Sequence, residues 1–185
     1  GQFAKAELMG RRLLIQLPTE SRLLRMRVQA WLADVVSERK PADAQKLLAQ
    51  VVETYPTVLR QLDITLPVTL SFAGPLGEAV ADRIQDSPRF SFDKMSSFKI
   101  EISTQSEGVS ICLVGAKQYG CIEQNTRHLD EDADLISTAI DAFHDKAFSP
   151  RLELTQSDVS SLDGSTVRQD ARSALDSLLG KERER

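Results

Sequence analysis

The first sixty residues carry apolar side chains at helical spacing. A stripe at i, i+4, i+7 and i+11 predicts a helix that begins near Thr19, a suitable N-cap, and ends near Ser37. The stripe consists of Leu24, Val28, Trp31 and Val35. We expect these side chains to face the core.

Two further helices are predicted beside this one. Pro41 suits the first turn of a helix, where its missing N–H would be unpaired, and an apolar stripe follows that stops before Pro56. A third helix is predicted over residues 3–16, ahead of Pro18. The helices on either side of Lys40 should form an antiparallel hairpin.

This hairpin has the spacing of a known repeat. The residues that carry the likeness are Trp31, Val35, Ala44, Leu48, Val51 and Pro56. On them, residues 22–56 resemble one tetratricopeptide-type helical hairpin. Leu32 departs from the repeat, which has a small residue there unless Ala33 takes that role. The resemblance implies a protein-interaction element, such as the end of a longer array, and an ordinary helical hairpin fits the same pattern.

From residue 63 the apolar period changes to two, which is typical of strands with one buried face. The alternation predicts strands near residues 63–72, 90–92, 98–103, 109–114 and 119–122, a short helix over 75–86 and a long helix over 130–148. Pro67 cannot donate to a ladder, so it predicts an edge position or a bulge for the first strand.

Strand register follows from keeping apolar side chains on one face. Pairing Ile102 with Val109, Ile100 with Ile111 and Phe98 with Leu113 places all six together. In the next hairpin, Cys112 would face Cys121, Ile111 would face Ile122 and Val114 would face Tyr119. Directly opposed cysteines form a candidate disulfide, which would imply an oxidising compartment. The alternative is two free thiols in a cytosolic protein.

These elements predict an α+β protein. An N-terminal helical hairpin region, residues 1–60, precedes a β-α-β-β-β-β-α domain, residues 61–150, with a mostly antiparallel sheet and helices packed on one face. Residues 151–185 are predicted to be a polar linker with a C-terminal amphipathic helix.

Charge is distributed unevenly along the 185 residues. The formal net charge is −4, but residues 1–60 carry +4 and residues 61–150 carry −7. A candidate partner-binding basic face consists of Arg11, Arg12, Arg22, Arg25 and Arg27. The alternative is a solvated face. Because the chain is acidic overall and no aromatic side chains alternate with these arginines, we expect no nucleic-acid partner.

Motifs for catalysis or cofactor binding are missing from the sequence. There is no nucleophile elbow, zinc-protease motif, P-loop or dinucleotide fingerprint, and two His with two Cys are too few for the common zinc sites unless all four are used. The acidic run 130–134 fits the first turn of a helix better than a calcium loop. His128 and His144 have no nucleophile beside them. We therefore predict no catalytic residue, cofactor or metal.

The predicted strand, the helix after it and the Ser-Pro-Arg-Phe entry to the next strand, residues 87–90, together resemble amino-terminal domains of bacterial periplasmic assembly proteins of the Tol and curli-secretion kind. We expect a non-enzymatic protein–protein interaction or assembly module of a bacterial envelope, periplasmic or secreted, with a cytoplasmic location as the alternative. Homo-oligomers are compatible with this, and no apolar run could span a membrane. Gly1 looks like a residue left by tag removal, so we expect a longer precursor. The competing hypothesis is an enzyme or small-ligand binder with a site between the helical region and the sheet domain.

Overall fold

The computed structural model describes residues 2–105, 108–125 and 132–152. They belong to two compact units, one containing residues 2–51 and the other Val52–Pro150. This division falls earlier than the expected one after residue 60. The predicted linker and helix beyond Leu152, with His128 and Asp130, lie outside the described residues.

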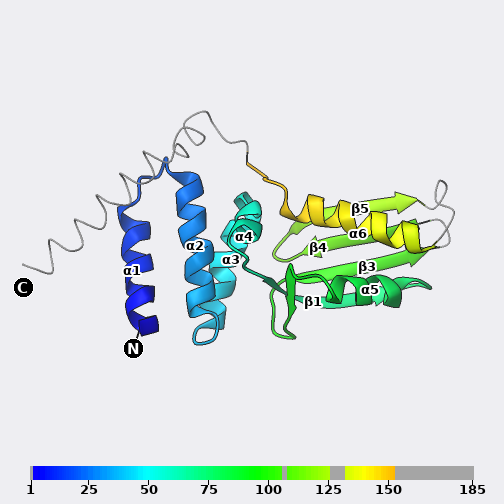
Figure 1. Cartoon of the computed structure of the whole chain (residues 1–185), viewed down its shortest axis with the longest axis horizontal. Helices are drawn as coiled ribbons and strands as arrows, with labels where there is room; N and C mark the ends of the chain where they lie inside the picture. Colours follow the sequence, from blue (N-terminus) through cyan, green and yellow to red (C-terminus); the bar gives the residue numbers. More distant parts are fainter. Residues whose placement is uncertain (1, 106–107, 126–131, 153–185) are drawn as a thin grey trace, which may run out of the picture. The chain divides into compact units, whose positions relative to one another are not determined.

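The first unit consists of helices that follow the predicted ones closely. They are α1 (Gln2–Gln16), α2 (Arg22–Val36) and the greater part of α3 (Pro41–Thr54). α1 packs along α2, as Figure 1 shows. The start of α2 differs from the prediction, because Ser21 takes the N-cap position and the hydroxyl of Thr19 donates to the Glu20 carboxylate instead.

The buried face of α2 differs from the predicted stripe. Trp31 keeps 40% of its surface exposed, whereas Leu32 and Val36 are fully buried. Apolar residues surround much of this helix, so the sequence pattern fits more than one inward face. Of the predicted stripe, Val28 alone is buried, and Leu24 and Val35 are half-buried.

The second unit is a five-stranded sheet with helices. After α4 (Thr57–Gln61), its elements are β1 (Leu66–Ala73), α5 (Gly77–Gln85), β2 (Phe90–Phe92), β3 (Lys99–Gln105), β4 (Gly108–Val114), β5 (Gln118–Asn125) and α6 (Asp132–Phe148). The strand order is β2-β1-β3-β4-β5. The α+β class and the element order are therefore as predicted.

Most paired positions in the sheet are antiparallel, as expected, but the sheet is mixed because it also contains parallel pairs. β1 pairs in parallel with both β2 and β3, while β3–β4 and β4–β5 are antiparallel. Phe92, the last residue of β2, is level with Val68, and Lys99, the first residue of β3, is level with Thr69. The chain therefore leaves one side of β1 and continues in the same direction on the other side. Apolar alternation defines faces but does not reveal such a crossing.

The expected edge position for Pro67 is wrong, since β1 lies between β2 and β3. The N–H of Leu66 donates toward β2, to Arg89 O, and the N–H of Thr69 donates toward β3, to Phe98 O. Pro67 shares its side with Thr69, but it precedes the first paired position there. The N–H that proline lacks would therefore have no acceptor in the β1–β3 ladder, so no ladder hydrogen bond is lost.

The β3–β4 register differs from the prediction by two residues. Ile102 faces Ile111 and Ile100 faces Leu113, because Thr104 continues the ladder opposite Val109. Thr104 is buried, and its hydroxyl donates to Ala73 O and accepts the N–H of Leu76. A polar residue with both hydrogen bonds satisfied can occupy the inner face of a strand.

The β4–β5 register is confirmed for Cys112 opposite Cys121 and for Ile111 opposite Ile122. The predicted pair of Val114 and Tyr119 is wrong. Val114 faces Gln118, and a register shift after Leu113 leaves Tyr119 as the extra residue of a bulge. Tyr119 is buried, with its ring 5.9 Å from that of Phe98.

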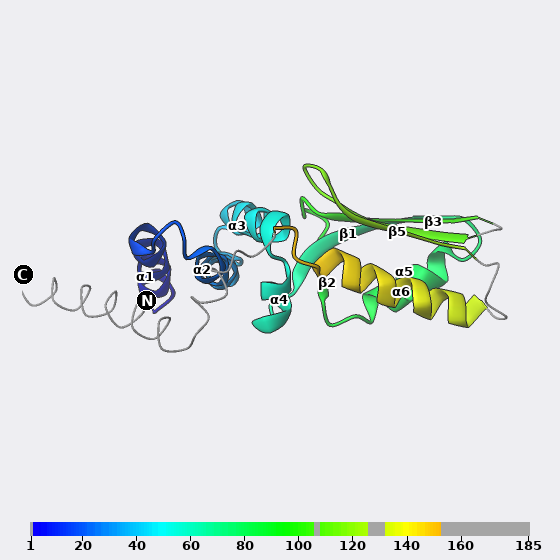
Figure 2. The same ribbon diagram turned by 90° about the horizontal axis from the view of Figure 1, so that it is seen from above.

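Helices α5 and α6 cover one face of the sheet, as predicted (Figure 2). α6 packs on β4 and β5, and α5 packs on β1 and β3. The stripe predicted for α6 is buried and consists of Leu135, Ile136, Ala139, Ile140, Phe143 and Ala147. The other face of the sheet is left for polar side chains.

Candidate functional site

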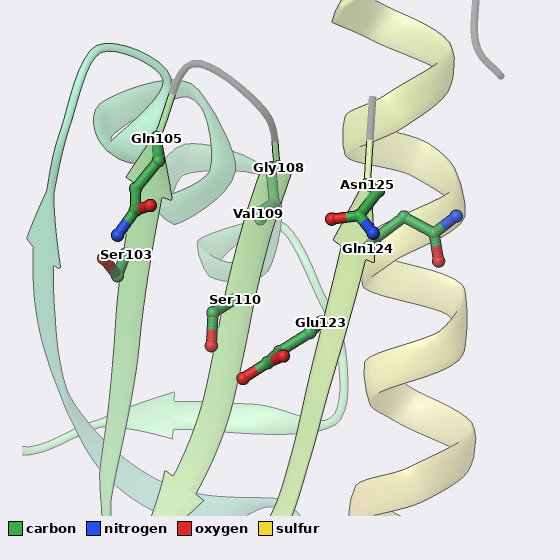
Figure 3. Close-up of a pocket in the computed structure, with 8 residues that line it drawn as sticks. All are labelled: Ser103, Gln105, Gly108, Val109, Ser110, Glu123, Gln124 and Asn125. Atoms are coloured by element: carbon green, nitrogen blue, oxygen red, sulfur yellow. The ribbon is translucent and has the colours of Figure 1, made fainter. Parts of the chain in front are cut away.

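The open face of the sheet carries polar side chains in rows across β3, β4 and β5. One row is Ser103, Ser110 and Glu123, and the next is Gln105, Gly108 and Asn125. They line a depression of about 260 Å³. Figure 3 shows the Glu123 carboxylate directed toward Ser110. Hydroxyls, amides and one carboxylate offer hydrogen bonds here.

The cysteines occupy the row beside this depression. Cys112 and Cys121 are directly opposed, with their Cα atoms 4.1 Å apart and their sulfurs at disulfide-bonding distance. The side-chain amide of Gln118 contacts Cys121 Sγ. Both cysteines are half-buried on the open face.

β5 is an edge strand of the sheet that the structure describes. A Cα separation of 4.1 Å is typical of a non-hydrogen-bonded antiparallel pair, in which the N–H and C=O groups point away from the partner strand. The N–H and C=O of Cys121, and by alternation those of Glu123, therefore point out of the sheet. Among the described residues, β5 pairs only with β4.

The predicted basic face is not one surface of free arginines. Arg11 donates to Glu7 and to Asp43, each at 3.0 Å. Arg25 donates to Leu14 O and Leu17 O at 2.8 Å, so it satisfies carbonyls at the end of α1. Arg12 and Arg22 are exposed, and Arg27 is half-buried. At least two of the five side chains thus stabilise the helical unit.

Glu7 is the centre of a charge cluster that the sequence pattern did not indicate. It is 8% exposed, and its carboxylate accepts hydrogen bonds from Lys40 and Arg11 and lies 3.7 Å from Arg39. The hydrogen bond from Lys40 and then that from Arg11 hold the pKa of Glu7 below its usual value. The cluster joins α1 to the α2–α3 turn, which is a structural role.

His144 lies within α6 with its ring against Phe90, at 5.7 Å between centroids. Its Nε2 is 3.2 Å from Ser87 Oγ, so the expectation that no nucleophilic group lies beside His144 is wrong. Burial lowers the pKa of His144, which favours the neutral ring. A second depression beside it is lined by Arg60, Arg89, Asp141, His144, Asp145 and Phe148. The sequence analysis considered His144 without giving it a role, and it did not indicate Arg60, Arg89 or Ser87, which are distant in sequence.

In the described part of the chain, no group of three or more His, Cys, Asp or Glu side chains is placed to hold a metal ion. No helix of that part is long and apolar enough to cross a membrane. The chain matches no protein-family model, no curated protein and no solved structure. The evidence for a function is therefore the geometry of the two units.

Proposed function

We propose that this chain is a non-enzymatic protein–protein interaction or assembly module of a bacterial envelope, periplasmic or secreted. The open edge of β5 carries the proposal. Its outward N–H and C=O groups can pair with an extended segment of a partner, and main-chain pairing of this kind provides affinity without a deep pocket.

The two edges of the sheet differ in their capacity to accept a strand. β2 has three residues and is followed at once by Asp93 and Lys94, which are features that protect edges. β5 has eight residues, no proline and one charged side chain, Glu123. A partner strand would therefore add beside β5.

The cysteine pair supports a location outside the cytoplasm. Cys112 and Cys121 lie at disulfide-bonding distance on a half-exposed face. Disulfides persist in the periplasm and outside the cell, whereas cytosolic thiols are kept reduced. Trapping thiols at the moment of lysis tests this directly. Both cysteines should resist alkylation until reductant is added, and two reactive thiols would contradict the envelope location.

The helical unit offers a second candidate surface for binding a protein partner. Its exposed apolar side chains include Leu8 and Ile15 on α1, which are 50% and 84% exposed, with basic residues beside them. A tetratricopeptide-type role for α2 and α3 remains part of the proposal, because that hairpin serves protein recognition. Isolated apolar side chains are common on surfaces, so this unit supports the proposal less than β5 does.

A proline at Glu123 tests the role of the edge. Glu123→Pro removes an outward N–H and leaves the bonds to β4 in place, while Glu123→Ala removes the side chain alone. Each full-length variant is expressed in the native host, and complexes are measured by size-exclusion chromatography with light scattering. Wild type and E123A should form the same complex, and E123P should elute as a folded free chain. A complex that E123P retains, or a wild-type chain without a partner, would refute the role.

A further inference from the structure

The depression beside His144 lies where α4, the segment before β2 and α6 meet, wholly within the second unit. Its volume is about 380 Å³, toward the low end of the roughly 300–1,000 Å³ common for small-molecule sites. Thr57 fixes one side of it, because its hydroxyl donates to Phe148 O at 2.6 Å. This hydrogen bond joins α4 to the last residue of α6, so two of the elements that line the depression are held together.

Two arginines and two aspartates line this depression. Arg60 Nη1 and Asp145 Oδ1 are 3.9 Å apart, and the Asp145 side chain is 84% exposed, so this pair is loose. No acidic group among the described residues lies within ion-pair distance of the half-buried Arg89 guanidinium. Charges of both signs are thus available to a ligand.

Two aromatic side chains, His144 and Phe148, also line the depression. The amide of Arg89 donates to Ser87 Oγ at 3.3 Å, which leaves the Ser87 hydroxyl proton free to be donated to His144 Nε2. Burial lowers the pKa of His144, the charges of Arg89 and Arg60 act in the same direction, and those of Asp141 and Asp145 oppose them. A neutral His144 adds no charge to that of the four ionised side chains.

We propose that this depression binds a small zwitterion of the amino-acid type, with its carboxylate on Arg89 and Arg60 and its ammonium group facing Asp141 and Asp145. Guanidinium groups pair with carboxylates through two parallel N–H···O bonds. A dianion would meet the two aspartates, whereas a ligand with both charges matches a lining whose formal charges cancel. The site is independent of the β5 edge and of the proposed function.

Titration with L-alanine tests the proposal. In the full chain with His128→Gln, His144 is the one remaining histidine, so its ring protons are resolved by NMR. L-Alanine should shift them saturably in the millimolar range. Acetate and methylammonium, which each carry one of the two charges, should bind at least about tenfold more weakly.

Two variants complete the test. Arg89→Gln removes a guanidinium that faces the depression and should weaken L-alanine binding at least about tenfold. Arg83→Gln removes an exposed arginine at the end of α5 and should leave binding unchanged. The proposal is overturned if L-alanine gives no saturable shift, if acetate binds as well as L-alanine, or if R89Q and R83Q respond alike.

Discussion

Gly74 lies so close to Thr104 that a Cβ on the glycine would overlap the threonine carbonyl oxygen. Gly74 also has a φ of +92°, which L side chains rarely adopt. Beside it, the hydroxyl of Thr104 bonds to Ala73 O and to the N–H of Leu76. The turn from β1 into α5 is thus held against β3 by the close contact of Gly74 with the Thr104 backbone and by the hydrogen bonds of the buried Thr104 hydroxyl.

Gly74→Ala should therefore lower the free energy of unfolding by about 2 to 4 kcal/mol, through backbone strain and the overlap with Thr104. Urea denaturation measures the loss. Gly77→Ala is the matched control, since a Cβ there would lie 3.5 Å from Phe72 and the residue begins α5. It should be neutral or stabilise by up to about 1 kcal/mol. Equal effects at the two glycines would contradict the role of Gly74.

Gly10 provides a spectroscopic test of the helical unit. A Cβ there would lie 2.9 Å from the Trp31 ring, and Trp31 is the single tryptophan of the chain. Gly10→Ala should push the ring outward and shift its fluorescence emission to longer wavelength, with a net stability loss below about 2 kcal/mol. Ala4→Ser, at an exposed position of α1, should leave the emission unchanged. An unaltered spectrum in G10A would argue against this contact.

Loss of the cysteine bridge should weaken the sheet without unfolding it. The cysteines are nine residues apart, so closing the loop stabilises by roughly 2 to 3 kcal/mol at most in the chain-entropy account. Ile111 and Leu113 still bury the other face of β4. The double variant C112S/C121S should match reduced wild type in urea denaturation and should not respond to reductant itself. Wild type that is equally stable with and without reductant would contradict the bridge.

His144 makes stability depend on pH. Its folded pKa lies below the ordinary value of 6.5, so between these values the unfolded chain binds more protons than the folded one. This contribution is fully present above pH 6.5 and decreases as the pH falls through the folded pKa. His144→Gln should flatten that part of the stability profile in thermal denaturation. Lys146→Gln, on the same helix, should keep the wild-type slope, and a slope unchanged in H144Q would refute the assignment.

Sequence reasoning succeeded where burial is one-sided. Alternation in β3 and β4, and the stripe of α6, identified the inner faces, because each of these elements packs against one neighbour layer. It failed at Thr104, since a polar residue with two internal hydrogen bonds looks like a turn residue in sequence. It failed at Trp31 because α2 is apolar on several sides and no single stripe is favoured.

The candidate sites were less predictable than the fold. The pairing of Cys112 with Cys121 could be predicted because the register of a hairpin depends on nearby residues, and these cysteines are only nine residues apart. Arg60, Arg89 and His144 come together through packing of α4 and α6 beside β2. No spacing along the chain encodes that proximity, and without a motif the histidine resembled a surface residue.

The parallel pairing of β1 with β3 has a consequence for the order of folding. The β3–β4–β5 meander joins strands that are close in sequence, whereas the pairing of Thr69 with Lys99 closes a long loop that contains α5 and β2. Local hairpins close faster than long loops, so we expect the meander to form first and β1 to dock onto it afterwards. During that interval the meander exposes both of its edges. The β3 edge is then covered by β1, whereas β5 gains no second partner strand among the residues that the structure describes.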